Sequence, residues 1–413
     1  MADTAAPAAM VLRPPGRTAA LVALAMAIML GMATWFSASA VVPQLRVEWD
    51  LSTSAGAWLT IAVQLGFVAG ALVSAALNIS DVLPARLVYA ACAVGAAAAN
   101  ALLVTSDGPA LGILLRALTG FFMAGVYPPL MKVLSTWYRP TERGTALGLL
   151  TGAIAMGAAV PHLVNAFGGA SWETVVWATS ALTLAGVVVG LLFVRDGPYP
   201  FPAASFDPGQ VRKVFRNRGV RLASLGYFGH MWELFAMWAW FSLFLADSLA
   251  AAGTPDPRAA SLGTFAVIGA GGVGCWLGGV LGDRWGRSNT TALAMAFSGT
   301  CSLTIGFLFG RSLWFLLPLG LVWGATVVAD SAQFSTAVTE VTDQSYVGTA
   351  LTLQYAVGFT LTVATIWLVP IVRDASSWGW AFAMLAPGPA LGIAAMLRLR
   401  GSPQAARIAG GRG

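Results

Sequence analysis

The chain has 413 residues, of which 57% are hydrophobic and only 10% are charged. Soluble globular proteins average about 45–50% apolar and about 25% charged residues, so this chain has too little charge to cover a surface that faces water. The composition therefore excludes an ordinary cytosolic enzyme and a disordered regulator. The net charge of +6 does not indicate a nucleic-acid-binding protein, because the basic residues fall between long apolar runs.

The apolar residues form twelve segments, each close to the about 20 residues that a membrane-spanning helix needs. The first six lie at 18–40, 55–78, 85–105, 109–132, 144–166 and 173–194. The other six lie at 222–246, 261–282, 288–310, 313–337, 347–370 and 378–398. Backbone polar groups in lipid must be satisfied internally, which requires helices. We predict an all-α membrane protein with twelve transmembrane helices in two six-helix bundles, over residues 18–195 and 222–398.

The remaining segments are two tails, residues 1–17 and 399–413, and a linker, residues 196–221, in which we expect a short interfacial helix. If the spans alternate from a cytoplasmic N-terminus, 18 of the 23 basic residues fall on the cytoplasmic side. The opposite side receives four, Arg46, Arg258, Arg311 and Arg373. This asymmetry predicts that both termini and the linker are cytoplasmic. The Ala- and Arg-rich composition favours a bacterial inner membrane, and we expect the first span to stay uncleaved.

The segment Gly279-Val280-Leu281-Gly282-Asp283-Arg284-Trp285-Gly286-Arg287, which joins spans eight and nine, carries the clearest motif. It resembles the G-x-L-x-D-R-x-G-R loop of the major facilitator superfamily. A counterpart about 202 residues earlier keeps the motif acid at Asp81, but Leu77 and Pro84 stand where the glycines would be. The complete copy is therefore in the second half of the chain.

Two further segments are similar to motifs of that family. Arg116 to Gly120 resembles its fourth-span pattern, and Glu142 to Ala146 resembles its E-R-G-x-A loop. The resemblance implies a two-domain helical transporter that has a central site and works by alternating access. The gating residues that it implies are Gly279, Asp283, Arg284, Gly286, Arg287, Asp81 and Arg143.

The motif residues also suggest a physical role of their own. Gly279 is small enough to let two helices approach closely. Asp283 lies near a helix end, where it can cap a neighbouring helix or pair with Arg284 or Arg287. Such contacts would hold one packing state and break in another, so we expect a latch at this end of the molecule.

Three charged residues fall well inside the predicted spans: Arg116, Glu233 and Asp330. A charge there costs about 2.5–3.5 kcal/mol even on the lenient insertion scale, so intramembrane charges indicate function. Arg116 is expected to bind an anionic substrate group, the alternative being a structural ion pair or a bond to broken backbone. Glu233 is expected to carry the coupled proton, because desolvation favours its neutral form.

The remaining candidates lie near these charges. His230 is three residues before Glu233 and shares its helix face, so it would bind substrate or modulate the proton. Asp330 would carry a proton, or pair with Arg143 or Arg287. Tyr227, Gln64 and Gln354 are expected to line the substrate site, although a buried glutamine more often bonds to a neighbouring helix.

The sequence therefore predicts a secondary transporter of a small solute, coupled to protons, with a small organic anion as the first substrate hypothesis. The alternative is a drug or metabolite efflux antiporter, which the glycine-rich fifth span and the abundant Trp and Met favour. We expect a monomer without a cofactor. The spans carry no GxSxG, HExxH or paired-Asp motif, so no enzyme is predicted. The two histidines lie on separate spans with no cysteine nearby, so no metal site is predicted.

Overall fold

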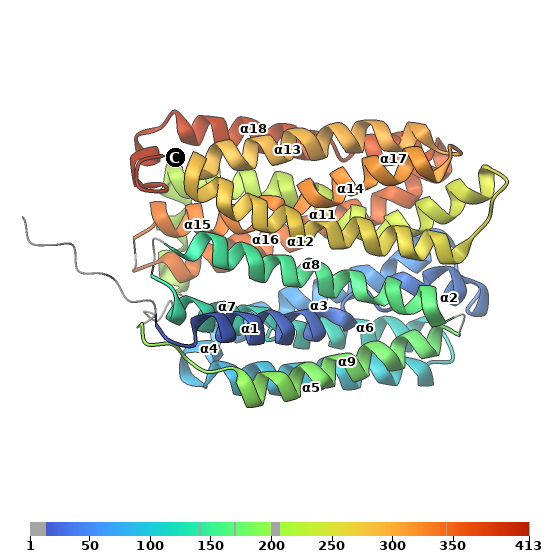
Figure 1. Cartoon of the computed structure of the whole chain (residues 1–413), viewed down its shortest axis with the longest axis horizontal. Coiled ribbons are helices and arrows are strands. Elements are labelled where there is room, and N and C mark those ends of the chain that lie inside the picture. Colours follow the sequence, from blue (N-terminus) through green and yellow to red (C-terminus); the bar gives the residue numbers. More distant parts are fainter. Residues whose placement is uncertain (1–13, 140–141, 169–170, 200–206, 344, 413) are drawn as a thin grey trace, which may run out of the picture.

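The computed structural model describes residues 14–139, 142–168, 171–199, 207–343 and 345–412, and all regular structure in this part of the chain is helical. Twelve helical stretches are long and apolar enough to cross a membrane. Their axes run roughly parallel, and the start of α1 and the end of the chain lie at the same end of the molecule (Figure 1). We call this end the terminus face and the other end the opposite face.

The helices agree closely with the twelve predicted spans. The N-terminal half contains α1 (Arg17–Gly31), α2 (Val42–Glu48), α3 (Thr53–Ala76), α4 (Ile79–Val82), α5 (Ala85–Leu102), α6 (Pro109–Met123), α7 (Tyr127–Trp137), α8 (Arg143–Gly168) and α9 (Trp172–Phe193). The C-terminal half contains α10 (Val211–Arg216), α11 (Arg218–Ala251), α12 (Pro257–Trp285), α13 (Arg287–Thr304), α14 (Leu313–Ala329), α15 (Ser331–Val341), α16 (Val347–Ala375), α17 (Trp378–Ala383) and α18 (Pro387–Arg400). The prediction of a twelve-helix membrane protein is confirmed.

Several spans consist of two helices rather than one. Span four breaks between α6 and α7, where Pro128 and Pro129 occupy the first turn of α7 and cannot donate to the preceding turn. Span ten breaks at Asp330, between α14 and α15. Span one ends its regular α-helix at Gly31 and continues as short 3-10 turns as far as Val41. These breaks place irregular backbone deep in the molecule, where hydropathy alone predicts continuous helix.

The segments outside the spans are only partly described. Of the predicted N-terminal tail, residues 1–13 lie outside the described residues, as do residues 200–206 of the linker. The described part of the linker contains the short helix α10. The C-terminal tail folds back onto the bundle, because Ile408 is fully buried and Ala409 nearly so.

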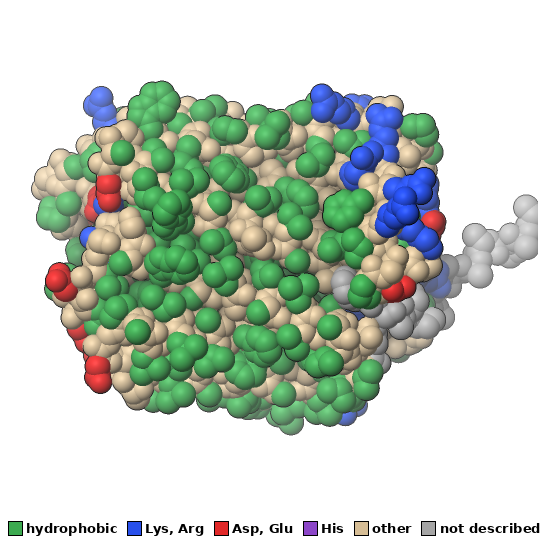
Figure 2. Space-filling view, turned by 180° about the vertical axis from the view of Figure 1, so that it is seen from behind, with side chains coloured by type: hydrophobic (Ala, Val, Ile, Leu, Met, Phe, Trp, Pro, Cys, Tyr) green, Lys and Arg blue, Asp and Glu red, His purple; other side chains and the backbone are tan. Residues whose placement is uncertain are grey.

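The two halves pack against each other along two helix pairs, α8 with α12 and α3 with α16. The surface around the middle of the molecule is largely apolar, whereas charged side chains gather at the ends (Figure 2). In this view, Lys and Arg concentrate at the terminus face and most of the visible Asp and Glu at the opposite face. The apolar middle fits a lipid environment, and the charged ends fit the two water interfaces.

Candidate functional site

A cavity of about 740 Å³ lies between the two halves. Its wall comes from the span-one break, α7 and α8 on one side, and from α11, α15 and α16 on the other. Most wall residues are aromatic or aliphatic, among them Trp35, Phe36, Tyr127, Tyr227, Trp238 and Phe359. This size and character are those of a site for a drug-sized molecule with an apolar body.

The deep end of the cavity is built from aromatic rings of both halves. The ring of Phe67 on α3 lies 5.1 Å from that of Trp35 and 4.3 Å from that of Phe359 on α16, between ring centres. Phe235 on α11 lies 5.2 Å from Phe359 and 5.6 Å from Trp238. Because these rings come from both halves, any rearrangement of one half against the other must separate them.

Polar contacts join the halves nearer the opposite face. The Asn165 side-chain amide donates to the Ser261 hydroxyl at 3.1 Å, and Arg373 Nη2 donates to the Thr53 hydroxyl at 3.0 Å. The cavity wall instead extends to Glu340, close to the end of α15 at the terminus face. In this conformation the cavity therefore reaches toward the terminus face, and contacts between the halves close the opposite face.

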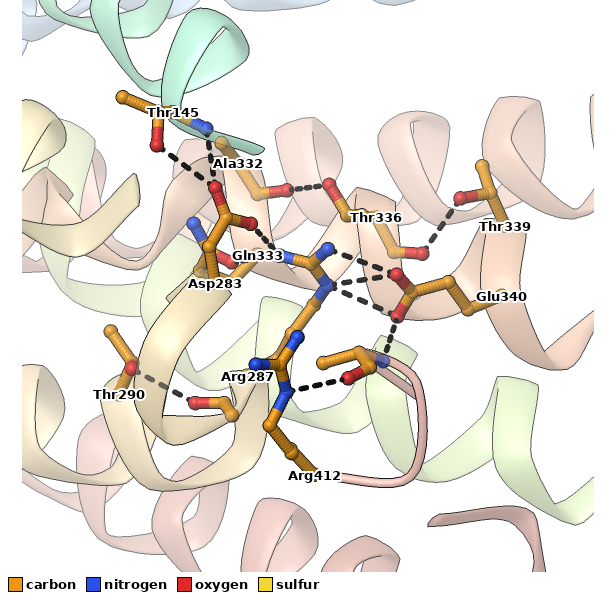
Figure 3. Close-up of polar contacts among 12 residues, drawn as sticks. Thr145, Asp283, Arg287, Thr290, Ala332, Gln333, Thr336, Thr339, Glu340 and Arg412 are labelled. Carbon is orange, nitrogen blue, oxygen red and sulfur yellow. Dashed lines mark hydrogen bonds and ion pairs between the residues drawn. The ribbon is translucent and has the colours of Figure 1, made fainter. Parts of the chain in front are cut away.

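A polar network at the terminus face contains the motif acid Asp283 (Figure 3). Asp283 Oδ2 accepts hydrogen bonds from the Thr145 backbone N–H at 3.0 Å and from its hydroxyl at 2.9 Å. These donors lie in the first turn of α8, in the other half of the chain. Asp283 Oδ1 lies 3.5 Å from Arg287 Nη1. Both contacts expected of Asp283, the helix cap and the pair with Arg287, are present, whereas Arg284 is exposed.

The glycines of this region allow the close approach. A Cβ on Gly144 would lie 2.0 Å from Asp283 Oδ1, and a Cβ on Gly279 would lie 3.0 Å from the Thr145 Cα atom. Gly286, which joins α12 to α13, has a φ of 96°, a backbone conformation that favours glycine. The motif glycines thus bring α8 within hydrogen-bonding distance of Asp283.

Glu340 is a member of the network that the sequence analysis did not identify. Its carboxylate accepts from Arg287 Nε at 3.0 and 3.1 Å and from Nη2 at 2.9 Å, and Arg287 Nη1 donates to Gln333 at 2.7 Å. The Ala409 N–H of the C-terminal tail donates to Glu340 Oε2 at 3.1 Å. Glu340 is 53 residues from Arg287, so no local sequence pattern could indicate the pair.

The other two predicted gating residues are Arg143 and Asp81, and only for Arg143 is the side chain described. Arg143 is half-buried at the cavity wall, where its Nε donates to the Tyr138 carbonyl at 3.0 Å and its Nη2 to the Ser135 carbonyl at 2.9 Å. These bonds tie the start of α8 to the end of α7. The side chain of Asp81 lies outside the described residues.

Arg116 does not lie in the cavity wall, contrary to the expectation for a substrate ligand. Its side chain is fully buried, and its guanidinium donates to the backbone carbonyls of Thr34, Trp35 and Leu59. It also donates to Ser37 Oγ at 3.1 Å and Asn100 Oδ1 at 2.9 Å. The physical reason is the break in span one, which frees carbonyl groups that need donors in a membrane interior. Arg116 therefore stabilises the segment that presents Trp35 and Phe36 to the cavity.

His230 and Asp330 form a buried pair beside the cavity. His230 Nδ1 lies 2.9 Å from Asp330 Oδ1, and both side chains are only 1% exposed. The other ring nitrogen, Nε2, is hydrogen-bonded to Ser331 Oγ at 2.7 Å, and Ser331 lines the cavity. The expected pairing of Asp330 with Arg143 or Arg287 is therefore wrong, because the break at Asp330 directs its carboxylate to α11.

Glu233 is buried within the C-terminal half and is not part of the cavity wall. Its Oε1 accepts from the Trp323 indole N–H at 2.7 Å, and its Oε2 accepts from the Ser298 hydroxyl at 2.8 Å. The two acids on which the sequence analysis focused thus have different environments. Asp330 is linked to the cavity through His230 and Ser331, whereas Glu233 bridges α11 to α13 and α14.

Tyr227, Gln64 and Gln354 were all expected to line the substrate site. Tyr227 does line the cavity, and its ring centre lies 5.8 Å from that of Tyr355, another wall residue. Gln64 and Gln354 are buried outside the wall, and the polar atoms of both amides have no hydrogen-bond partner among the described residues. The structure therefore gives these two glutamines no contact with the cavity.

We predict that Asp283→Asn slows exchange between conformational states and leaves ligand affinity nearly unchanged. The amide loses the negative charge that faces Arg287 and the α8 N-terminus, but it lies far from the aromatic end of the cavity. Exchange rates between fluorophores placed on the ends of α8 and α12 would measure this. The control is Asp256→Asn, which changes an acid that caps only its own helix, α12. Unchanged exchange with a large loss of affinity would contradict the prediction.

Three comparisons place the chain among known proteins. The family model of the Major Facilitator Superfamily matches residues 24–365. The uncharacterized transporters YgaY of Escherichia coli (strain K12) and of Escherichia coli O157:H7 are each 29% identical over 170 residues, which is 40% of this chain and 41% of those relatives. The fold is similar to the crystal structure of a bacterial homologue of the human lysosomal transporter Spinster, in an inward-facing and unoccupied conformation. That likeness has a TM-score of 0.63 at 14% identity and covers 93% of this chain and 95% of the other. With the family model matched over most of its length, the chain belongs to the Major Facilitator Superfamily of membrane transporters.

Proposed function

We propose that this transporter exchanges a neutral or cationic amphipathic molecule with an aromatic body for protons. The observation that carries the proposal is the cavity wall, in which Trp35, Phe36, Trp238 and Phe359 form the deep end. Aromatic faces bind flat apolar groups and also attract cations. The aromatic cavity wall thus supports the efflux alternative, which the glycine-rich fifth span and the abundant Trp and Met also favour.

The environment of Arg116 removes the main argument for an anionic substrate. Its guanidinium donates to five protein acceptors and does not reach the cavity. The charged wall residues, Arg143 and Glu340, are near the helix ends at the terminus face rather than at the aromatic end. A substrate at the aromatic end therefore needs no negative charge to be recognised.

Proton coupling is proposed to use the pair His230 and Asp330. The Ser331 hydroxyl, which is bonded to His230 and lines the cavity, links this pair to the cavity. A cationic or amphipathic substrate beside Ser331 changes the field and the solvation of the pair, so substrate and proton compete. Competition of this kind gives exchange rather than joint transport. Glu233 remains a second candidate carrier, although its carboxylate accepts from Ser298 and Trp323, which are not part of the cavity wall.

The proposed membrane orientation places the terminus face in the cytoplasm of a bacterial inner membrane. Its support is the concentration of Lys and Arg at that face, which Figure 2 shows for one side of the molecule. The cavity would then reach toward the cytoplasm, where an exported compound would enter.

A matched ligand series tests the proposed substrate class. The series is 1-naphthol, (1-naphthylmethyl)trimethylammonium and 1-naphthalenesulfonate, which share a ring system and differ in charge. We expect the neutral and cationic members to raise the melting temperature of the purified protein, since binding to the folded state stabilises it. Stabilisation by the sulfonate alone, or by none of the three, would contradict the proposal.

Two tryptophan variants locate the binding. Trp238→Leu is expected to weaken binding by about 5- to 30-fold, because it removes an aromatic contact worth roughly 1–2 kcal/mol. Trp314→Leu is the control, since Trp314 is 87% exposed on the outer surface of α14. Equal losses in both variants would contradict binding at the aromatic end of the cavity.

A further inference from the structure

Seven exposed basic side chains gather at the terminus face of the C-terminal half. They lie on α10, at the start of α11 and at the end of α18, and are Arg212, Lys213, Arg216, Arg218, Arg221, Arg398 and Arg400. Figure 2 shows Lys and Arg gathered at the terminus end of the molecule, over the half that contains α13 and α18 in Figure 1. We call these seven residues the basic patch.

The packing of α11 on α18 brings the parts of the patch together. Gly226 of α11 faces Met396 of α18, since a Cβ on Gly226 would lie 2.7 Å from the Met396 sulfur. About two turns farther toward the terminus face, the start of α11 lies beside the chain that follows α18, because a Cβ on Gly219 would lie 3.2 Å from Gln404. The patch is therefore one surface built from segments about 180 residues apart in the sequence.

The charges of the patch are not compensated within the described chain. None of the seven side chains forms an ion pair with a described acid, whereas nearby Arg407 is paired with Asp343 at 3.6 Å. Like charges so close together repel one another unless anions from outside lie between them. The surface therefore favours a ligand that carries negative charge.

Apolar side chains next to the patch indicate what kind of anion this is. Phe215 is 59% exposed on α10, and Leu225 and Leu397, 52% and 47% exposed, lie one turn or less from patch residues on α11 and α18. A headgroup phosphate at the patch would place its acyl chains along these side chains. A free phosphate or a nucleic acid would leave them without a partner.

The patch is held rigidly. Asn217, between α10 and α11, accepts hydrogen bonds from the backbone N–H groups of Gly219 and Val220. Its amide donates to the Val341 carbonyl at 3.1 Å and the Tyr346 hydroxyl at 3.0 Å. These bonds fix α10 to the ends of α15 and α16, so the cations of α10 are positioned before a ligand arrives.

We propose that the basic patch is a binding site for the headgroup of an anionic phospholipid of the surrounding bilayer. The guanidinium groups bind the phosphate oxygens through paired, charge-assisted hydrogen bonds. The acyl chains pack on Phe215 and on the exposed leucines of α11 and α18. A lipid bound in this way stabilises the C-terminal half at the point where the linker joins it.

Lipid titrations of the purified full chain in detergent test the proposal. Phosphatidylglycerol is compared with phosphatidylcholine of the same acyl chains, and inorganic phosphate and glycerol 3-phosphate serve as the headgroup without its chains. We expect phosphatidylglycerol alone to raise the melting temperature at low micromolar concentration, with an effect that weakens as salt rises. Equal effects of the two lipids would overturn the proposal, and an equal effect of free phosphate would make the patch an anion site without lipid selectivity.

Charge-neutralising variants place the site. Arg398→Gln/Arg400→Gln and, separately, Arg212→Gln/Arg216→Gln are each expected to weaken phosphatidylglycerol binding by about tenfold. The control is Arg258→Gln/Arg311→Gln, which removes two exposed cations near the opposite face. The α10 variant changes only exposed side chains of a short helix, so it still measures the contribution of the patch to lipid binding if the α18 variant is poorly folded. Unchanged lipid affinity in both patch variants would overturn the assignment.

Discussion

The Asp330→Asn variant is expected to bind substrate but to release no proton when it does so. Asp330 is buried at the break in span ten, 2.9 Å from the His230 ring, and the proposed exchange uses its carboxylate as part of the proton site. An amide keeps the size of the side chain but cannot be titrated. Substrate binding to the wild type should therefore acidify a weakly buffered solution, and binding to the variant should not.

Glu233→Gln is the matched comparison, because it neutralises the acid of α11, which is buried within a span as Asp330 is. The glutamine amide oxygen can still accept from the Trp323 indole N–H, and the Ser298 hydroxyl, which donates to Glu233 in the wild type, can turn to accept from the amide NH2 group. We expect this variant to keep most of the substrate-linked proton release. Loss of release in Glu233→Gln, with release retained in Asp330→Asn, would instead make Glu233 the proton carrier. Ser331→Ala should slow release without abolishing it, since it removes only the link between the cavity and His230.

The Arg116→Met variant is expected to lose roughly 3 kcal/mol or more of folding stability, the largest stability effect of any substitution considered. Methionine fills the space of the aliphatic stem but removes all the guanidinium hydrogen bonds, to the carbonyl groups of Thr34, Trp35 and Leu59 and to the side chains of Ser37 and Asn100. Each buried acceptor without a partner costs about 1–3 kcal/mol. The stability of Arg116→Lys should lie between those of the wild type and Arg116→Met, because an ammonium group reaches fewer of these acceptors.

Thermal and denaturant unfolding of the purified protein measures this effect. Arg311→Met is the control, because Arg311 is an exposed arginine near the opposite face. The Arg116→Met variant also separates the two interpretations of Arg116, a substrate ligand or a structural residue. A protein of normal stability that has lost affinity for anions would show that Arg116 is a substrate ligand, and would contradict the structural role.

The fold could be predicted because its main determinant is local in sequence. A run of about 20 apolar residues has one stable form in lipid, and each such run became a span. The contact between Asp283 and Arg287 could also be predicted, since the two residues are four apart across a helix junction. The cap that Asp283 provides for α8 could be predicted in the same way, because an acid at a helix end is stabilised by a neighbouring helix N-terminus.

The parts of the site that could not be predicted depend on contacts between distant segments. The pairs of His230 with Asp330 and of Arg287 with Glu340 join residues 100 and 53 positions apart. Arg116 was expected to bind an anion because hydropathy shows a charge in a span but not the carbonyl groups freed by a break in another span. Single intramembrane charges therefore indicated which residues mattered, but not which partners they had.

Exchange across a membrane tests the central claim most directly. Proteoliposomes that enclose a fluorescent pH indicator are exposed to external (1-naphthylmethyl)trimethylammonium, a permanent cation that carries no proton itself. Entry in exchange for protons predicts that the interior becomes more alkaline with the wild type, but not with Asp330→Asn or in protein-free liposomes. Uptake of the cation without a change in internal pH, or with acidification, would contradict proton exchange through this cavity.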